Sequence, residues 1–170
     1  MSTPARFAEA RYELPLRSGG TLEVAPLAAA DGACLGAIFA AIDPWAVYGY
    51  PAAALSNFLS DTEPGAPRLA LQIGAEVAGA AVIRTAWLRG PYLQFFGVVP
   101  AHQNHGLGSA VLAWMEAEAR AAEERNLWVA VSEINSEAQR LYEHHGFTPA
   151  ARLDDLAWDG RTEILMRKRL

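Results

Sequence analysis

The stretch YLQFFGVVPAHQNHGLGS, residues 92–109, decides the fold. Its first half, Tyr92 to Val99, is apolar and predicts a strand that Pro100 ends. Gln103 to Gly108 predicts a tight turn rich in backbone N–H groups, from which a long amphipathic helix starts. The unpaired N–H groups of a first helical turn and the positive end of the helix dipole attract anions. The stretch therefore predicts a strand, a turn and a helix that together form an anion site.

The glycine spacing excludes two familiar phosphate-binding motifs. The Walker spacing with its Lys-Ser/Thr pair is absent, and the dinucleotide fingerprint needs a third glycine and a later acidic residue that do not fit here. Gly-x-Gly turns before helices are common, so the spacing alone leaves a plain tight turn as an equal alternative.

Two separated motifs resemble the GNAT superfamily of acetyltransferases. Gln103-x-x-Gly106-x-Gly108 resembles its acyl-CoA signature, and NSEAQRLYEHHGF, residues 135–147, resembles its Asn-x-x-Ala-x-x-x-Tyr-x-x-x-Gly-Phe segment. The resemblance covers about residues 68–170 and is only topological before them. It implies an α/β (α+β) GNAT fold, with a mixed, mostly antiparallel sheet of about seven strands flanked by about four helices.

The sequence predicts one domain, residues 1–170, in which residues 1–20 form an N-terminal arm that is either poorly ordered or an edge contact. Asp31 is the candidate N-cap of the first helix. Three successive strands over residues 68–99 must be antiparallel, whereas the strand-helix-strand unit after them predicts a parallel pair. We expect strands at residues 21–27, 68–73, 77–85, 92–99, 127–131, 147–156 and 162–169, and helices at 28–42, 52–59, 107–126 and 135–145.

Composition limits the classes of function. With 170 residues, 52% hydrophobic and 19% charged, the chain is typical of one globular domain. The net charge of −5 argues against a nucleic-acid partner, and the absence of a long apolar run argues against a membrane one, so we expect a cytoplasmic protein. The single cysteine, Cys34, excludes a disulfide framework, and it is expected to be buried. His102 and His105 lack a third ligand nearby in sequence, so no metal is expected.

The resemblance implies that acetyl-CoA is the co-substrate and that its pantetheine arm pairs with the backbone of one strand. In this interpretation Gly97 accommodates a bulge that splays two parallel strands, and an N–H near Val98 polarises the acyl carbonyl. Gln103 could instead lock the turn, and Asn135 could contact CoA, cap its helix, or do both. The expected cofactor-binding residues are Phe96, Gly97, Val98, Gln103, Asn104, His105, Gly106, Leu107, Gly108, Ser109 and Asn135.

Tyr142 is the candidate general acid. A tyrosine of ordinary pKa is protonated at neutral pH and can give its proton to a departing thiolate; the alternative is an aromatic ring that anchors its helix. The general base is less defined, because the family's glutamate position is Ala130 here. Glu133 is a candidate, and deprotonation through a water molecule oriented by Tyr92 and Gln94 is the default expectation.

An aromatic loop between two prolines, residues 43–51, borders the acceptor side in the implied fold. Its aromatic residues either pack the loop down or form a substrate wall, and Asp43 either holds a cation or caps a helix. The expected substrate-binding residues are Asp43, Trp45, Tyr48, Tyr92 and Gln94.

The resemblance therefore implies an N-acetyltransferase that transfers the acetyl group directly to a primary amine, either a small molecule or a peptide N-terminus. The alternative is a catalytically inactive acyl-CoA-binding or regulatory GNAT domain. A flavodoxin-like nucleotide binder is disfavoured, because it requires alternating strands and helices throughout. A homodimer is among the assemblies that such folds allow.

Overall fold

The computed structural model describes residues 7–170. Its strands are β1 (Tyr12–Pro15), β2 (Thr21–Pro26), β3 (Arg68–Ile73), β4 (Glu76–Trp87), β5 (Gly90–Val98), β6 (Asn126–Ser132), β7 (Thr148–Asp154) and β8 (Thr162–Arg169). Its helices are α1 (Ala29–Phe39), α2 (Trp45–Tyr48), α3 (Ala52–Ser60), α4 (Leu107–Ala121) and α5 (Ser136–His144), with a 3₁₀ turn at Pro100–His102.

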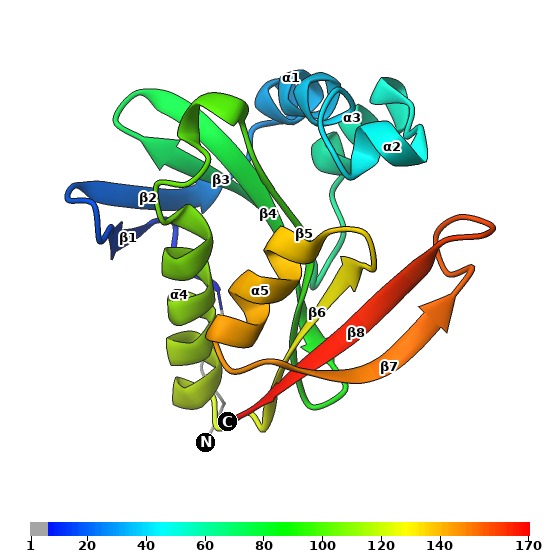
Figure 1. Ribbon diagram of the computed structural model, residues 1–170. Helices are drawn as coiled ribbons and strands as arrows, with labels where there is room; N and C mark the ends of the chain where they lie inside the picture. The colour runs from blue at the N-terminus through cyan, green and yellow to red at the C-terminus, as the bar shows by residue number, and fades with distance from the viewer. Residues whose placement is uncertain (1–6) are drawn as a thin grey trace.

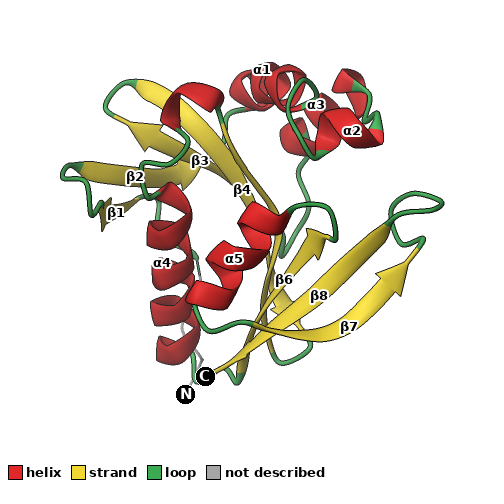
Figure 2. Cartoon of the chain, viewed as in Figure 1, coloured by secondary structure: helices red, strands yellow, loops and turns green. Residues whose placement is uncertain are grey.

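All described strands form one sheet in the order β1-β2-β3-β4-β5-β6-β8-β7. Helices α4 and α5 lie side by side in front of the sheet in Figure 1, and α1, α2 and α3 gather at its upper end. Every pair of neighbouring strands is antiparallel except β5 and β6. The predicted α/β class and the single parallel pair are therefore confirmed (Figure 2).

The expected count of seven strands and four helices was too low. Within the predicted N-terminal arm, β1 pairs with β2, with Tyr12 opposite Val24, so the edge-contact interpretation holds for this part of the arm. Residues 1–6 lie outside the described part of the chain. The aromatic loop contains the extra helical turn α2, and α4 ends at Ala121, so Asn126 begins β6 instead of ending a helix.

Strand β4 separates two apolar clusters, because successive side chains of a strand point to opposite faces. Ala81 and Ile83 pack with Val111 of α4, whereas Ala80 and Val82 pack with the α1 and α3 side chains around Phe39. All six are fully buried. Burying one large apolar side chain of this kind contributes about 1.5–3 kcal/mol, so both helix layers are held firmly to the sheet.

The bulge in β5 lies at Gln94 and not, as expected, at Gly97. Val82 pairs with Phe95 and Ile83 with Leu93, so Gln94 is the extra residue. A bulge reverses the alternation of the strand from that point on. Phe95 therefore faces the α1 side and Phe96 the α4 side.

Gly97 itself pairs regularly with Ala80. The reason for a glycine here is the ring of Phe39, since a Cβ at position 97 would lie 2.8 Å from Cζ of that ring.

Strands β5 and β6 separate soon after they start. Only two residue pairs join them, Tyr92 with Trp128 and Leu93 with Val129, although β5 continues to Val98. The expected splay of two parallel strands is thus present, with the Gln94 bulge at its origin. It leaves a gap between the carboxyl ends of the two strands.

Two expectations for α1 are wrong. Ala28, with extended dihedrals and no side-chain hydrogen bond, is the N-cap, and Asp31 lies within the first turn. Cys34 is exposed because α1 packs on α3 through another face: a Cβ on Gly32 or Gly36 would come within 3 Å of the α3 backbone. None of the helices in residues 7–170 has the length and apolarity needed to cross a membrane.

Candidate active site

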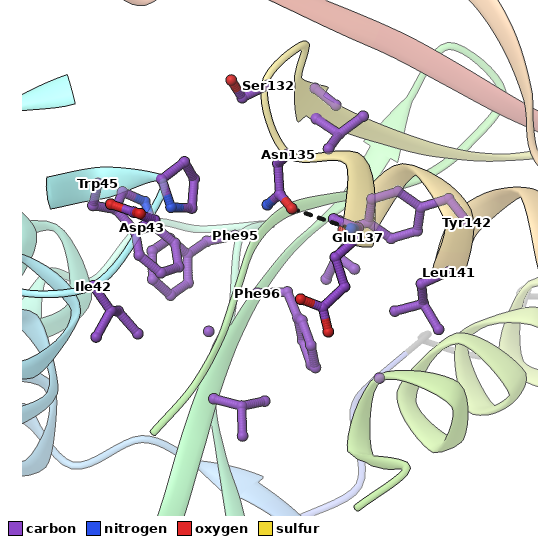
Figure 3. Close-up of a pocket in the computed structure, with 18 of the residues that line it drawn as sticks. Ile42, Asp43, Trp45, Phe95, Phe96, Ser132, Asn135, Glu137, Leu141 and Tyr142 are labelled. Atoms are coloured by element: carbon purple, nitrogen blue, oxygen red, sulfur yellow. Dashed lines mark hydrogen bonds between the residues drawn. The ribbon is translucent and has the colours of Figure 1, made fainter. Parts of the chain in front are cut away.

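A cavity of about 750 Å³ occupies the gap between β5 and β6. Most of the side chains expected from the sequence meet there, from β5, the following turn, α4, α5 and the aromatic loop (Figure 3). His105 and Glu133 are not among the lining residues. The expected residues that line it are Asp43, Trp45, Tyr48, Tyr92, Gln94, Phe96, Gly97, Val98, Gln103, Asn104, Gly106, Leu107, Gly108, Ser109, Asn135 and Tyr142.

The turn before α4 is shaped by two left-handed residues, Asn104 (φ 62°) and Gly106 (φ 86°), and Gly106 is the N-cap of α4. The side chain of Gln103 donates a hydrogen bond from Nε2 to the Val98 carbonyl, 3.1 Å away. Gln103 therefore locks the turn to the end of β5. No atom lies within 4 Å of a Cβ built on Gly106, so the space in front of the helix N-terminus is open.

The second glycine of the turn serves a different purpose. A Cβ on Gly108 would lie 2.8 Å from Cδ2 of Leu141, so this glycine lets α4 approach α5. Next to it, Ser109 Oγ and His145 Nε2 are hydrogen-bonded at 3.0 Å. Burial lowers the pKa of His145, which favours the neutral imidazole.

The two expected residues outside the cavity have other contacts. His105 is exposed, and its carbonyl accepts a hydrogen bond from Ser18 Oγ at 3.4 Å. Glu133 is exposed and forms a bidentate ion pair with Arg152, with Nη2 3.2 Å from Oε2. Its carboxylate is therefore engaged at the surface.

Tyr142 projects from α5 into the apolar layer next to the cavity and is only 7% exposed. Burial raises the pKa of its hydroxyl, and the nearby Tyr92 raises it further, so the expectation of an ordinary pKa is wrong. The hydroxyl is protonated throughout the neutral range. Asn135 caps α5, since its Oδ1 accepts from the Ala138 N–H at 3.1 Å (Figure 3).

The wall opposite α5 is aromatic. Trp45 stacks on Phe95 with ring centroids 5.0 Å apart, and both line the cavity. Tyr50 stacks on Trp158 of the β7–β8 turn at 5.2 Å, which brings that turn over the same wall. Asp43 does not cap α2, whose N-cap is Pro44, and its side chain lies beside Trp45 in Figure 3.

Three polar features of the cavity were missed or left incomplete by sequence reasoning. Glu163 at the start of β8 lines the cavity, and burial raises its pKa. Ser132 Oγ and Gln94 Oε1 are buried and have no hydrogen-bond partner. The signal for Glu163 in the sequence was an acidic residue directly before the apolar run Ile164 to Met166.

The gap connects the two faces of the sheet. Tyr142 belongs to the α4–α5 cluster, whereas Phe95 belongs to the α1–α3 cluster, and both line the same cavity. Two substrates can therefore meet in it from opposite faces. Among residues 7–170, no group of three or more His, Cys, Asp or Glu side chains is placed to hold a metal ion.

Comparison with protein-family models identifies the family. Residues 34–147 match the family model described as acetyltransferase (GNAT) family. The chain belongs to the GNAT acetyltransferase family. GNAT enzymes use acetyl-CoA as their co-substrate. No curated protein sequence matches this GNAT chain significantly.

Many solved GNAT structures share its fold. Nourseothricin acetyltransferase is 26% identical with a TM-score of 0.56, over 62% of this chain and 66% of that one. The GNAT domain of S. lividans PAT is 22% identical with a TM-score of 0.68, over 96% of this chain and 98% of that one. The ribosomal-protein-S18-alanine N-acetyltransferase from Escherichia coli is 22% identical with a TM-score of 0.67, over 87% and 93%.

Proposed function

We propose that the protein transfers the acetyl group of acetyl-CoA directly to a primary amine, without a covalent enzyme intermediate. The observation that carries this proposal is the gap between β5 and β6, which opens to both faces of the sheet and is bordered by the glycine turn on one side and Tyr142 on the other. A site open to two faces suits a reaction in which two substrates meet.

The residues present fit acetyl-CoA. Gly106 leaves open space at the N-terminus of α4, where backbone N–H groups and the helix dipole favour a pyrophosphate. Beyond Leu93, β5 pairs with β4 on one edge and with no described strand on the other, so its backbone is available to the pantetheine amides. When bound, acetyl-CoA supplies an acyl group activated as a thioester. We assign polarisation of its carbonyl to a backbone N–H near Val98.

We assign the general-acid role to Tyr142. Burial keeps its hydroxyl protonated, so a proton is available when the thiolate leaves. The same burial that raises the pKa of the tyrosine also raises that of a thiol in the cavity, so the two groups remain matched in basicity. Asn135 fixes the start of α5 by its cap and thereby positions Tyr142 two helical turns later.

The proposal is tested by release of free thiol from acetyl-CoA with a panel of small amines, amino acids and peptides with free N-termini. We expect turnover with one acceptor class. The competing function, an inactive acyl-CoA-binding domain, is favoured by the surface ion pair of Glu133, which removes one candidate base. It predicts binding of acetyl-CoA, measured by calorimetry, with no turnover on any acceptor.

A further inference from the structure

The acceptor side of the cavity contains a carboxylate without a counter-ion. Glu163 lines the cavity, and its pKa is raised by burial alone. Within residues 7–170, no Lys or Arg side chain forms an ion pair with it, whereas Glu133, at the carboxyl end of the adjacent strand, is paired with Arg152. Glu163 is half-buried. A half-buried carboxylate without a cationic partner is costly, and such groups are concentrated at functional sites.

Three tyrosines line the same cavity as this carboxylate. Burial raises the pKa of Tyr48, Tyr50 and Tyr92, and the charge of Glu163 raises each of them further. The guanidinium of Arg161 lies over the Tyr48 ring, 5.1 Å from its centroid, and forms no ion pair with Glu163 in the described part of the chain. A carboxylate among aromatic rings is a favourable environment for an organic cation.

Two residues that line the same cavity each have a buried acceptor atom without a hydrogen-bond partner. Ser132 is the direct cross-strand partner of Glu163, so their side chains lie next to each other on one face of the sheet. Ser132 is 4% exposed and its Oγ has no hydrogen-bond partner; Gln94 Oε1, at the bulge, is also buried without one. Leaving a buried polar atom unpaired destabilises the fold, so each such atom calls for an explanation.

We propose that Glu163, with Ser132 Oγ and Gln94 Oε1, binds the acceptor as a primary ammonium and that Glu163 takes the proton that this nitrogen must lose before it attacks. An ammonium supplies three N–H donors and one positive charge, which matches one carboxylate and two neutral acceptors. This inference rests on the proposed function. The stacked rings of Trp45 and Phe95 on the same wall favour an apolar carbon skeleton behind the ammonium.

The proton and bond changes balance. One proton passes from the ammonium to the Glu163 carboxylate and then to solvent, leaving a neutral amine. The amine lone pair forms the C–N bond as the C–S bond of the thioester breaks. The nitrogen loses a second proton to solvent as the amide forms. The departing thiolate gains a proton from Tyr142, and solvent returns one proton to Tyr142.

The experiment compares wild type with Glu163→Gln, which removes the charge and keeps the shape. The control is Glu23→Gln on β2, whose carboxylate is paired with Arg11 away from the cavity. Turnover is measured by free-thiol release, and binding of 2-phenylethylamine and of its neutral analogue 2-phenylethanol by the change in intrinsic tryptophan fluorescence, to which Trp45 in the cavity wall contributes. We expect Glu163→Gln to lower kcat/KM about 100-fold and to weaken amine binding about 10-fold, without changing the affinity for acetyl-CoA. The control Glu23→Gln should have the turnover and the amine binding of wild type.

The pH profile separates a proton acceptor from a structural residue. Wild-type kcat/KM should fall as the pH drops through the raised pKa of Glu163. Tyr48, Tyr50 and Tyr92 have raised pKa values and stay neutral there, so this fall in kcat/KM reports the titration of Glu163. In Glu163→Gln, kcat/KM should no longer show the titration of this carboxylate. It should instead follow the fraction of the free acceptor that is a neutral amine.

Two outcomes overturn the inference while the proposed function stands: equal turnover and amine binding in Glu163→Gln and wild type, or a loss confined to Glu133→Gln. A different result would support the ammonium site and contradict the proposed function. This result is amine binding that depends on Glu163, with preference over the alcohol but no turnover on any acceptor.

Discussion

Gly97 of β5 lies directly against the ring of Phe39 in α1, so close that a Cβ at position 97 would be 2.8 Å from Cζ of the ring. Phe39 is fully buried and its ring lies 5.5 Å from that of Phe95, which lines the cavity. The fit of one glycine to one aromatic ring thus sets how closely the α1–α3 layer, and with it the aromatic wall, approaches the central strand.

Gly97→Ala should therefore destabilise the protein by about 1–3 kcal/mol, because the well-packed Phe39 ring must move. Urea denaturation measures the change through the midpoint at constant slope. Combining Gly97→Ala with Phe39→Leu should cost less than the sum of the two single changes, because the smaller side chain makes room for the methyl group. Strict additivity of the two changes would contradict the assigned contact.

Gln103→Ala should raise the KM for acetyl-CoA several-fold and leave kcat nearly unchanged. The Gln103 side chain joins the turn to the Val98 carbonyl, and without this bond the turn that faces the pyrophosphate is less well ordered. Initial rates at saturating amine measure both constants. Gln139→Ala is a matched control, because this glutamine also bonds backbone carbonyls, of Ser132 and Glu133, but lies outside the turn and the cavity lining. An equal change in KM for the two variants would argue against the assigned role.

Glu163→Gln should stabilise the folded protein at neutral pH. The folded-state pKa of Glu163 is raised by burial, so the stability that its neutral form provides is fully present below the unfolded pKa and is lost as the pH rises through the folded pKa. The variant should thus have a Tm about 1–3 °C above wild type at pH 7 and equal to it near pH 4.

Glu116→Gln is a control for which the change in Tm at pH 7 should have the opposite sign. Burial raises the pKa of Glu116, but hydrogen bonds from Lys168 and Arg120 outweigh this and lower it overall. Its ionised form therefore stabilises the fold above the unfolded pKa, and the amide should lower the Tm at pH 7. Thermal melts of both variants at the two pH values measure the contrast. A lower Tm for Glu163→Gln at pH 7 would show that the carboxylate is compensated in the folded state.

The elements that sequence reasoning predicted well are those specified by local chemistry. The strand, turn and helix over residues 92–109 and the Asn135 cap of α5 each depend on neighbouring residues. Local signals such as Pro100 and the Gly-x-Gly spacing are sufficient for them.

The features that were missed depend on pairing between distant strands. The bulge at Gln94 follows from the register of β4 against β5, and a single-residue shift in that register decides which side chains face the cavity. Glu163 becomes a cavity residue because β8 pairs with β6 and places it opposite Ser132. Glu133 was a candidate base because it is close to Asn135 in sequence, but β7 supplies Arg152 as its partner.

The measurement that tests the central claim most directly is the single-turnover rate of acetyl transfer for wild type and Tyr142→Phe, with acetyl-CoA binding measured in parallel by calorimetry. The phenylalanine keeps the buried ring and removes only the acidic proton. We predict that the variant binds acetyl-CoA like wild type and transfers the acetyl group about 100-fold more slowly. Equal rates in the two proteins, or wild-type protein that binds acetyl-CoA and acetylates no amine, would contradict the account.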